Sequence, residues 1–303
     1  MNIISPVQVT DAVLTSSDVP ENDAPEFDIG TTYALNDKVM VTTAGVHSVY
    51  VSLIASNTGN QPEDDDPVNP QYWARVSATN RWAMFSDQIS DRTEQAAEIN
   101  VSLSPGALVN ALSFFSLDAV EVTVVMTDPS EGEVYSRTFE LVDASGVNTW
   151  YDWYFEPIVR QSDLAVLDLP PYPSADIDVT ISNPSGVAKL GLFDMGVNRR
   201  LGDADFGTSV GIQDYSRKER DTFGNPVVVR RNFSKRADFT VTVDTNYVSE
   251  VQRILAANRT TPITWIGSTE YGATIVYGYY RDFNIILSNY SKSLLNVEVE
   301  GLT

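Results

Sequence analysis

The apolar residues of this chain come in short runs, and this pattern restricts the fold more than any other feature of the sequence. The runs are rich in Val, Ile, Thr and Tyr and are interrupted by Asn, Asp, Gly and Pro, as strands separated by turns are. Residues 177–181 alternate strictly between apolar and polar, which predicts a half-buried strand. We expect strands at Val39–Thr43, Val49–Ile54, Ala119–Met126, Val134–Val142, Ile177–Ser182, Phe239–Val243, Ala273–Tyr280 and Leu294–Val299. Many short strands at this spacing predict sandwiches or small barrels, so we expect a mainly β fold.

One segment has helical rather than strand periodicity. Its apolar residues fall on one face of a helix: Val248, Val251, Ile254 and Leu255. Thr245 and Asn246 are cap-type residues before it, and Asn258 with the Thr-Pro that follows would end it. The sequence therefore predicts one helix over about residues 246–257.

Charge divides the chain near residue 196. Residues 1–195 hold 7 Lys/Arg against 29 Asp/Glu, whereas residues 196–303 hold 13 against 12. The densest basic stretch, Arg199–Arg236, has 9 Lys/Arg and 5 Asp/Glu. It is either a solvated connector or a docking surface for an acidic partner, such as the acidic half of another copy. The formal net charge of -21 argues against a nucleic-acid partner and against docking on an anionic membrane.

The composition argues against most catalytic and metal chemistry. The chain has no Cys and one His, which excludes disulfides, thiol catalysis and Cys-based metal sites and nearly excludes His-based triads. The 41 acidic residues single out no catalytic pair, and no nucleophile elbow or phosphate-binding loop is present. We therefore expect no enzyme, no catalytic residues, no cofactor and no metal. His47 has no partner evident in the sequence, so we expect a structural or solvent-exposed residue. The acidic loop Glu63–Asp66 could bind a hard cation, but an exposed turn is the commoner outcome.

The sequence shows neither a membrane-spanning segment nor a signal peptide. No apolar run approaches the ~18 residues of a membrane span, so we expect no membrane insertion. The first 23 residues have no basic region followed by a long apolar run, so we expect no signal peptide.

Residues 28–78 contain regularly placed aromatic and turn residues. These are Tyr33, Asp37, Val39, Val41, Gly45, Tyr50, Asn57, Pro62 and Trp73. The pattern resembles the small chitin- and cellulose-binding modules of carbohydrate-binding families 5 and 12. The resemblance implies sugar contact through Tyr33, Tyr50, Asn57, Tyr72 and Trp73. A module this small must also use aromatic residues as its core, so the same side chains have a purely structural interpretation. In the adjacent pair Tyr72 and Trp73, one side chain would face inward and the other outward.

Residues 79–197 begin with Asn80-Arg-Trp82-Ala-Met84-Phe85 and continue as a series of strands. This order resembles galactose-binding-like jelly rolls and modules of bacteriophage tail proteins. Within this unit, residues 150–155 read Trp-Tyr-Asp-Trp-Tyr-Phe. Strand alternation would place one side of this cluster in the core, and the other side in an inter-domain contact or a sugar platform. We hence expect a central jelly-roll β-sandwich.

The remaining residues, 198–303, form a Gly/Arg-rich connector followed by a β unit with the predicted helix. This unit resembles the tail-tip and tail-tube class of phage proteins. The domain organisation expected is an N-terminal arm (1–27), a small carbohydrate-binding-like module (28–78), a sandwich (79–197) and a C-terminal β domain with one helix (198–303).

These resemblances imply a virion structural protein of a bacteriophage tail, at the tail tip, baseplate or fibre junction, assembled in the host cytoplasm. Its partners would be other tail proteins and copies of itself, with host-surface polysaccharide bound through the carbohydrate-binding-type modules. The alternative is a free, non-catalytic polysaccharide-binding protein.

Overall fold

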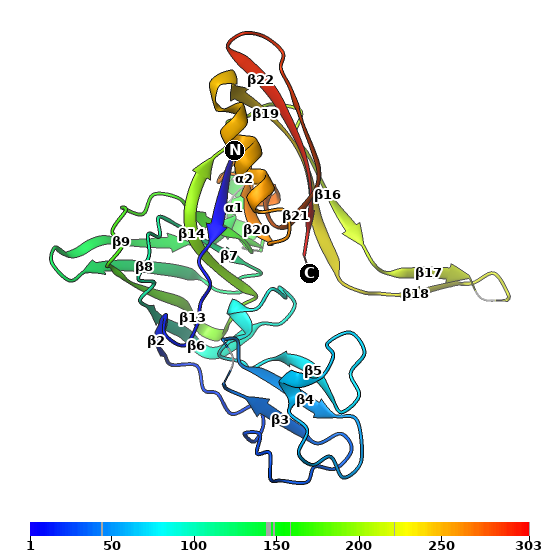
Figure 1. The fold of residues 1–303 in the computed structure, drawn as a ribbon. Helices are drawn as coiled ribbons and strands as arrows, with labels where there is room; N and C mark the ends of the chain where they lie inside the picture. The colour runs from blue at the N-terminus through cyan, green and yellow to red at the C-terminus, as the bar shows by residue number, and fades with distance from the viewer. Residues whose placement is uncertain (44, 144–146, 148, 158, 221, 303) are drawn as a thin grey trace.

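The protein is mainly β, as the sequence predicts (Figure 1). The fold is known from a computed structural model, which describes all residues except 44, 144–146, 148, 158, 221 and 303. All eight segments predicted as strands overlap strands of the structure. Five antiparallel sheets contain all the strands of the described residues.

The largest sheet has ten antiparallel strands, which come from both ends and the middle of the chain. In order across the sheet they are β12 (Leu164–Val166), β7 (Ala111–Phe115), β14 (Leu192–Arg200), β1 (Asn2–Pro6), β20 (Ile263–Ile266), β21 (Ile275–Ile286), β22 (Lys292–Gly301), β19 (Phe233–Asp244) and β15 (Asp203–Ala204), with β16 (Ser209–Asp214) also paired to β19. The sheet crosses the charge break near residue 196, because β14 continues through it. The change in charge therefore does not coincide with a break in the backbone pairing.

A second sheet packs on one end of the large sheet to form a sandwich. Its strands, in order, are β2 (Leu14–Ser17), β6 (Thr93–Leu103), β13 (Asp176–Leu190), β8 (Glu121–Asp128) and β9 (Gly132–Glu140). Alternate residues of β8, such as Val122 and Val124, are fully buried and share one core with Phe114 and Phe193 of the large sheet. The rings of Phe114 and Phe193 lie 4.9 Å apart, which is the distance of a favourable aromatic pair.

The first residues of the chain belong to the large sheet and are not a separate arm. β1 pairs with β14 on one side and with β20 on the other. Ile3 and Ile4 are both fully buried, and consecutive side chains of a strand point to opposite faces. Ile3 accordingly enters the core of the C-terminal domain, and Ile4 enters a cluster that joins this domain to the sandwich. The sequence interpretation missed this role because two buried isoleucines beside polar residues give no periodic signal.

A small module is inserted in the chain between β2 and β6, two strands of the sandwich. Its three-stranded sheet has the order β3 (Lys38–Val41), β4 (Ser48–Ser52) and β5 (Trp73–Ala78). Short 3-10 turns occur in this module and in the other two units, at η1 (Pro62–Asp64), η2 (Ala83–Phe85), η3 (Thr245–Tyr247) and η4 (Gly272–Thr274).

The predicted helix of the C-terminal domain is present as α2 (Val248–Ala257). Val251 and Leu255 are its buried residues, and they pack on the C-terminal strands as the spacing predicts. The predicted side-chain cap at Thr245 is wrong: Thr245 begins η3, and its hydroxyl contacts Asn289 and Ser293 instead. Among the described residues, neither α-helix is long and apolar enough to cross a bilayer.

The aromatic cluster is a helix, and the prediction of a strand there is wrong. Residues Trp150–Phe155 form α1 beyond a two-residue hairpin, β10 (Val142–Asp143) with β11 (Val159–Arg160). Thr149 accepts a hydrogen bond from the backbone of Asp152, and the Asp152 carboxylate accepts one from the backbone of Thr149. This capping box outweighs the strand preference of the aromatic residues and starts the helix.

Candidate interaction surfaces

The aromatic residues predicted to bind sugar form the core of the small module. Trp73 is 1% exposed and Tyr33 is 8% exposed. Their rings lie 5.2 Å apart in an edge-to-face arrangement, and Phe27 lies 5.7 Å from Trp73 on another side. The indole Nε1 of Trp73 donates a hydrogen bond to the carbonyl of Asn60, so its polar atom is also satisfied internally. Neither ring offers a face to a sugar.

The other three residues predicted to bind sugar differ in their exposure to solvent. Asn57 is buried and donates hydrogen bonds from its amide to Ser52 Oγ and to the carbonyl of Tyr72. Tyr50 is half-buried and packs against the aromatic core. Tyr72 is 39% exposed, so the expectation that one member of the Tyr72 and Trp73 pair faces outward is met. The five residues are therefore brought close together, and Tyr72 has the most exposed ring among them.

The acidic loop of the small module is held in one shape by Asp65. Its carboxylate accepts hydrogen bonds from the backbone N–H groups of Gln71, Tyr72 and Trp73, at 2.6–3.1 Å. Partial burial disfavours the charge, but these hydrogen bonds outweigh it and lower the pKa of the Asp65 carboxyl. Within the part of the chain that the structure describes, no group of three or more His or acidic side chains is arranged to hold a metal ion.

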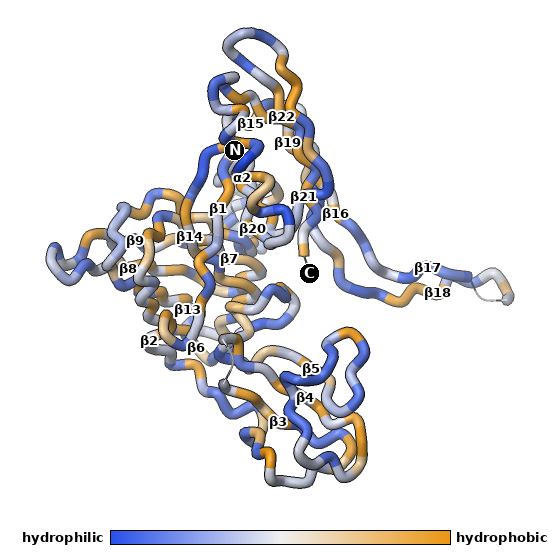
Figure 2. Tube along the Cα trace, in the orientation of Figure 1, coloured by the Kyte–Doolittle hydropathy of each residue, from blue (hydrophilic) through white to orange (hydrophobic). Residues whose placement is uncertain are grey.

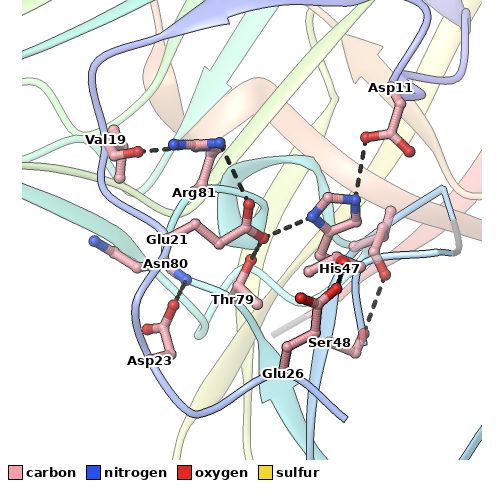
Figure 3. A network of polar contacts seen from close by, with 12 residues as sticks. Asp11, Val19, Glu21, Asp23, Glu26, His47, Ser48, Thr79, Asn80 and Arg81 are labelled. Atoms are coloured by element: carbon pink, nitrogen blue, oxygen red, sulfur yellow. Dashed lines mark hydrogen bonds and ion pairs between the residues drawn. The ribbon is translucent and has the colours of Figure 1, made fainter. Parts of the chain in front are cut away.

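His47 lies at the joint between the small module and the rest of the protein (Figure 3). It is 8% exposed, with Nδ1 2.7 Å from Glu21 Oε1 and Nε2 3.1 Å from Asp11 Oδ1. Nε2 makes no hydrogen bond among the described residues, although the Asp11 carboxylate lies close to it. The ring also packs 4.6 Å from the ring of Trp82. His47 is therefore structural, with partners that its own sequence neighbourhood does not reveal.

Glu21 is the centre of this joint. Its carboxylate accepts hydrogen bonds from the hydroxyl of Thr79 at 2.7 Å and from Arg81 at 3.3 Å. Close by, Asp23 accepts one from the backbone of Asn80 at 3.0 Å (Figure 3). The chain thus enters and leaves the small module at one point, where side-chain hydrogen bonds join residues 21–23 to residues 79–81.

A cavity of about 720 Å³ lies where the N-terminal segment, the small module, the sandwich and the C-terminal domain meet. Two of its lining residues are acids that accept hydrogen bonds from hydroxyl groups. Tyr277 donates to Asp87 at 2.8 Å, and Thr264 donates to Asp194 at 2.7 Å. Burial raises the pKa of Asp194 to about 7, with a smaller contribution from the charge of Asp87. The donors come from β20 and β21 and the acceptors from other segments, so these bonds tie separate parts of the molecule together.

A long basic hairpin projects from the large sheet (Figures 1 and 2). It comprises residues 209–233: β16 pairs with β19, and beyond it β17 (Arg217–Arg220) pairs with β18 (Pro226–Val229). Every residue of β16, β17 and β18 is exposed. It carries five Lys/Arg against three Asp/Glu, within a chain of net charge -21. The large apolar residues exposed on it are Val210, Ile212, Tyr215, Phe223, Val227, Val228, Val229 and Phe233.

The outer part of the hairpin is a sheet of two strands. Among the described residues, β17 and β18 pair with each other and with no further strand, so each has a free edge. Two strands without a packed face are marginally stable in water, and free edges invite pairing with another chain. The sequence indicated this surface by its charge but not by its shape, because Val227–Val229 alone would also fit a buried strand.

The aromatic helix α1 is a second exposed apolar surface. All five aromatic side chains are at least 68% exposed, with Trp150 at 82%. The expectation that one side of this cluster lies in the core is wrong, since none of its residues is buried. Neighbouring rings are inclined to one another by 35–69°, so they do not form the flat platform suited to a polysaccharide chain.

Comparison with known proteins gives no guide to function: no family model matches the chain, and no curated protein matches it.

Proposed function

We propose that this protein is a non-catalytic structural subunit of a bacteriophage tail that assembles with copies of itself and with other tail proteins. One observation carries the proposal: the basic hairpin projects from the body with both strand edges free and with apolar side chains in solvent. A monomeric protein gains nothing from this arrangement, whereas a subunit that pairs or packs the hairpin against a neighbour buries it.

The tail context comes from the sequence resemblances, and two other features are consistent with it. The large sheet joins β1, strands of the sandwich and strands of the C-terminal domain in one ladder, which suits a load-bearing subunit. The exposed aromatic helix α1 supplies a further surface of the kind that interfaces bury, because Trp and Tyr are enriched at binding hot spots. The site of action in this proposal is the virion, after assembly in the host cytoplasm.

The alternative, a free polysaccharide-binding protein, has less support. Tyr33, Asn57 and Trp73 are buried, and Tyr50 is half-buried. Binding of host polysaccharide would then depend on Tyr72 and residues outside the predicted set. We retain polysaccharide contact only as a secondary role of the small module.

Removal of the hairpin tip tests the proposal. Residues 218–229 would be replaced by Asn-Gly, so that Arg217 and Arg230 flank a two-residue turn in the register in which β16 pairs with β19. We expect the wild-type chain to form oligomers in sedimentation velocity experiments and this variant to remain monomeric with an unchanged circular dichroism spectrum. A wild-type chain that is monomeric at all accessible concentrations, or a variant that assembles normally, would contradict the proposal. Tail-assembly genes beside the coding sequence would support the phage context, and glycosidase genes would favour the alternative.

A further inference from the structure

A groove of about 520 Å³ lies at the root of the basic hairpin. Residues 230–235 form one wall, and residues 89–92 of the sandwich and the end of β22 form others. Residues 230–233 belong to both the hairpin and the groove, so a segment that enters the groove would also contact the root of the hairpin. The exposed ring of Phe233 adds apolar surface to the wall.

The groove holds three arginines without acidic partners. Within the residues that the structure describes, Arg92, Arg230 and Arg231 have no carboxylate within 4 Å. Lys235, the other cation of the groove, is fully engaged with Asp163 at 2.7 Å and with two backbone carbonyls. A chain with 41 acidic residues thus leaves three guanidinium groups unpaired in one concavity. Such a site favours a ligand with several carboxylates, because arginine binds carboxylate with two parallel hydrogen bonds.

The chain itself carries a segment of the complementary charge. Residues 63–66 are Glu-Asp-Asp-Asp, bounded by Pro62 and Pro67. Asp65 faces inward and fixes the loop through the backbone hydrogen bonds described above. Glu63 and Asp64 remain exposed. A loop whose shape is already fixed loses little conformational entropy on binding, which favours its use as a docking element.

We propose that the groove of one copy receives the acidic loop Glu63–Asp66 of a second copy. This inference rests on the proposed function, since it names the partner surface of the self-assembly. Within one chain, no hydrogen bond or ion pair among the described residues joins the loop to the groove, so both surfaces are available to another molecule. The contact is heterologous: each copy offers a loop to one neighbour and a groove to another, which builds a ring or a filament.

Charge reversal on each side tests this contact. The groove variant carries Arg230→Glu and Arg231→Glu, and the loop variant carries Glu63→Lys and Asp64→Lys. The loop changes leave Asp65 in place, so the shape of the loop is kept. Arg253→Glu with Arg259→Glu, and Glu131→Lys with Glu133→Lys, are controls that change the net charge equally at exposed positions elsewhere.

We expect each charge-reversed variant alone to self-associate about tenfold or more weakly than wild type at low salt, and the controls to associate normally. An equimolar mixture of the two variants should recover association, because the Lys loop of one then meets the Glu groove of the other. Normal association of either single-surface variant, or a mixture that fails to recover, would overturn the inference.

The same experiment separates the inference from the proposed function. If shortening the hairpin abolishes assembly but charge reversal has no effect, the proposed function stands and this loop is not the partner. If only a chain carrying all four substitutions recovers while the mixture does not, the loop docks within its own chain and the inference is wrong. A monomeric wild-type protein overturns both.

Discussion

Trp73 and Tyr72 are neighbours with opposite environments, and this difference decides how sugar binding should be tested. Trp73→Ala would leave a cavity in a core of few residues, so we expect a loss of ~3–5 kcal/mol in the stability of the small module. Tyr72→Ala removes a partly exposed ring and should cost less than about 1 kcal/mol. Chemical denaturation, followed by near-ultraviolet circular dichroism, would measure both.

The two variants, Trp73→Ala and Tyr72→Ala, also allow a polysaccharide-binding assay to be interpreted. Loss of polysaccharide binding in Trp73→Ala would report unfolding of the module, whereas loss in Tyr72→Ala at unchanged stability would report contact. If Trp73→Ala proved as stable as wild type, the core described here would be wrong.

Asp194 gives stability a pH dependence opposite to that of a carboxyl whose pKa is lowered on folding. Burial raises the pKa of Asp194 to about 7, whereas an unfolded Asp titrates near 4. Between these values the unfolded chain has lost this proton and the folded chain keeps it. The contribution of Asp194 to the free energy of unfolding is therefore greatest below about pH 4 and falls as pH rises to 7, by up to ~4 kcal/mol.

Asp194→Asn tests this directly. The amide keeps an acceptor for the hydroxyl of Thr264 and cannot ionise, so the variant should gain stability relative to wild type as pH rises from 4 to 8. Urea denaturation of both proteins at several pH values measures the difference, which cancels the effects of the other acids. A difference that does not change with pH would contradict the assignment.

At the scale of single elements, α1 can be followed through its tryptophans. Trp73, Trp82 and Trp265 are at most 1% exposed, whereas Trp150 and Trp153 are 82% and 68% exposed. We expect acrylamide to quench a fraction of the fluorescence that disappears in the Trp150→Phe and Trp153→Phe double variant. In the assembled protein, reduced quenching would report burial of α1. Equal quenching of all five tryptophans would contradict the exposure of the helix.

The elements that the sequence predicts correctly are those whose signal is local. The alternation in residues 177–181 fixes part of β13, and the spacing of Val251 and Leu255 fixes α2. The elements that it misses depend on distant partners or on competing local signals. β1 is a central strand only because β14 and β20 flank it. The cluster Trp150–Phe155 has strand composition, but its capping box makes it a helix.

The same distinction explains what could be predicted of the candidate sites. The sequence groups Tyr33, Tyr50 and Trp73 correctly in one module, because a small module brings its aromatic residues together. It cannot tell a core from a binding face, since both use the same residue types. The groove of unpaired arginines joins residues 92 and 230–231, which are far apart in the chain, so only the fold reveals it.

At the scale of the whole molecule, the small module is an insertion, and β1 is a central strand that joins the two parts of the large sheet. Asp23 and Asn80 are hydrogen-bonded at the point where the module begins and ends. Residues 24–79 can therefore be replaced by Gly-Gly without stretching the rest of the chain. By contrast, residues 2–6 fill the position between β14 and β20, and their loss would expose two strand edges and split the large sheet.

We accordingly expect the larger deletion to be the better tolerated one. The chain without residues 24–79 should be soluble and unfold cooperatively, with a modest loss of stability because Glu21 loses His47 and Trp82 loses its ring contact. The chain without residues 2–6 should be insoluble or lack a cooperative transition, because Ile3 and Ile4 anchor two separate cores. Solubility and thermal unfolding of the two variants measure this contrast. A stable protein without residues 2–6 would mean that the sandwich and the C-terminal domain are independent, and that β1 is not needed to join them.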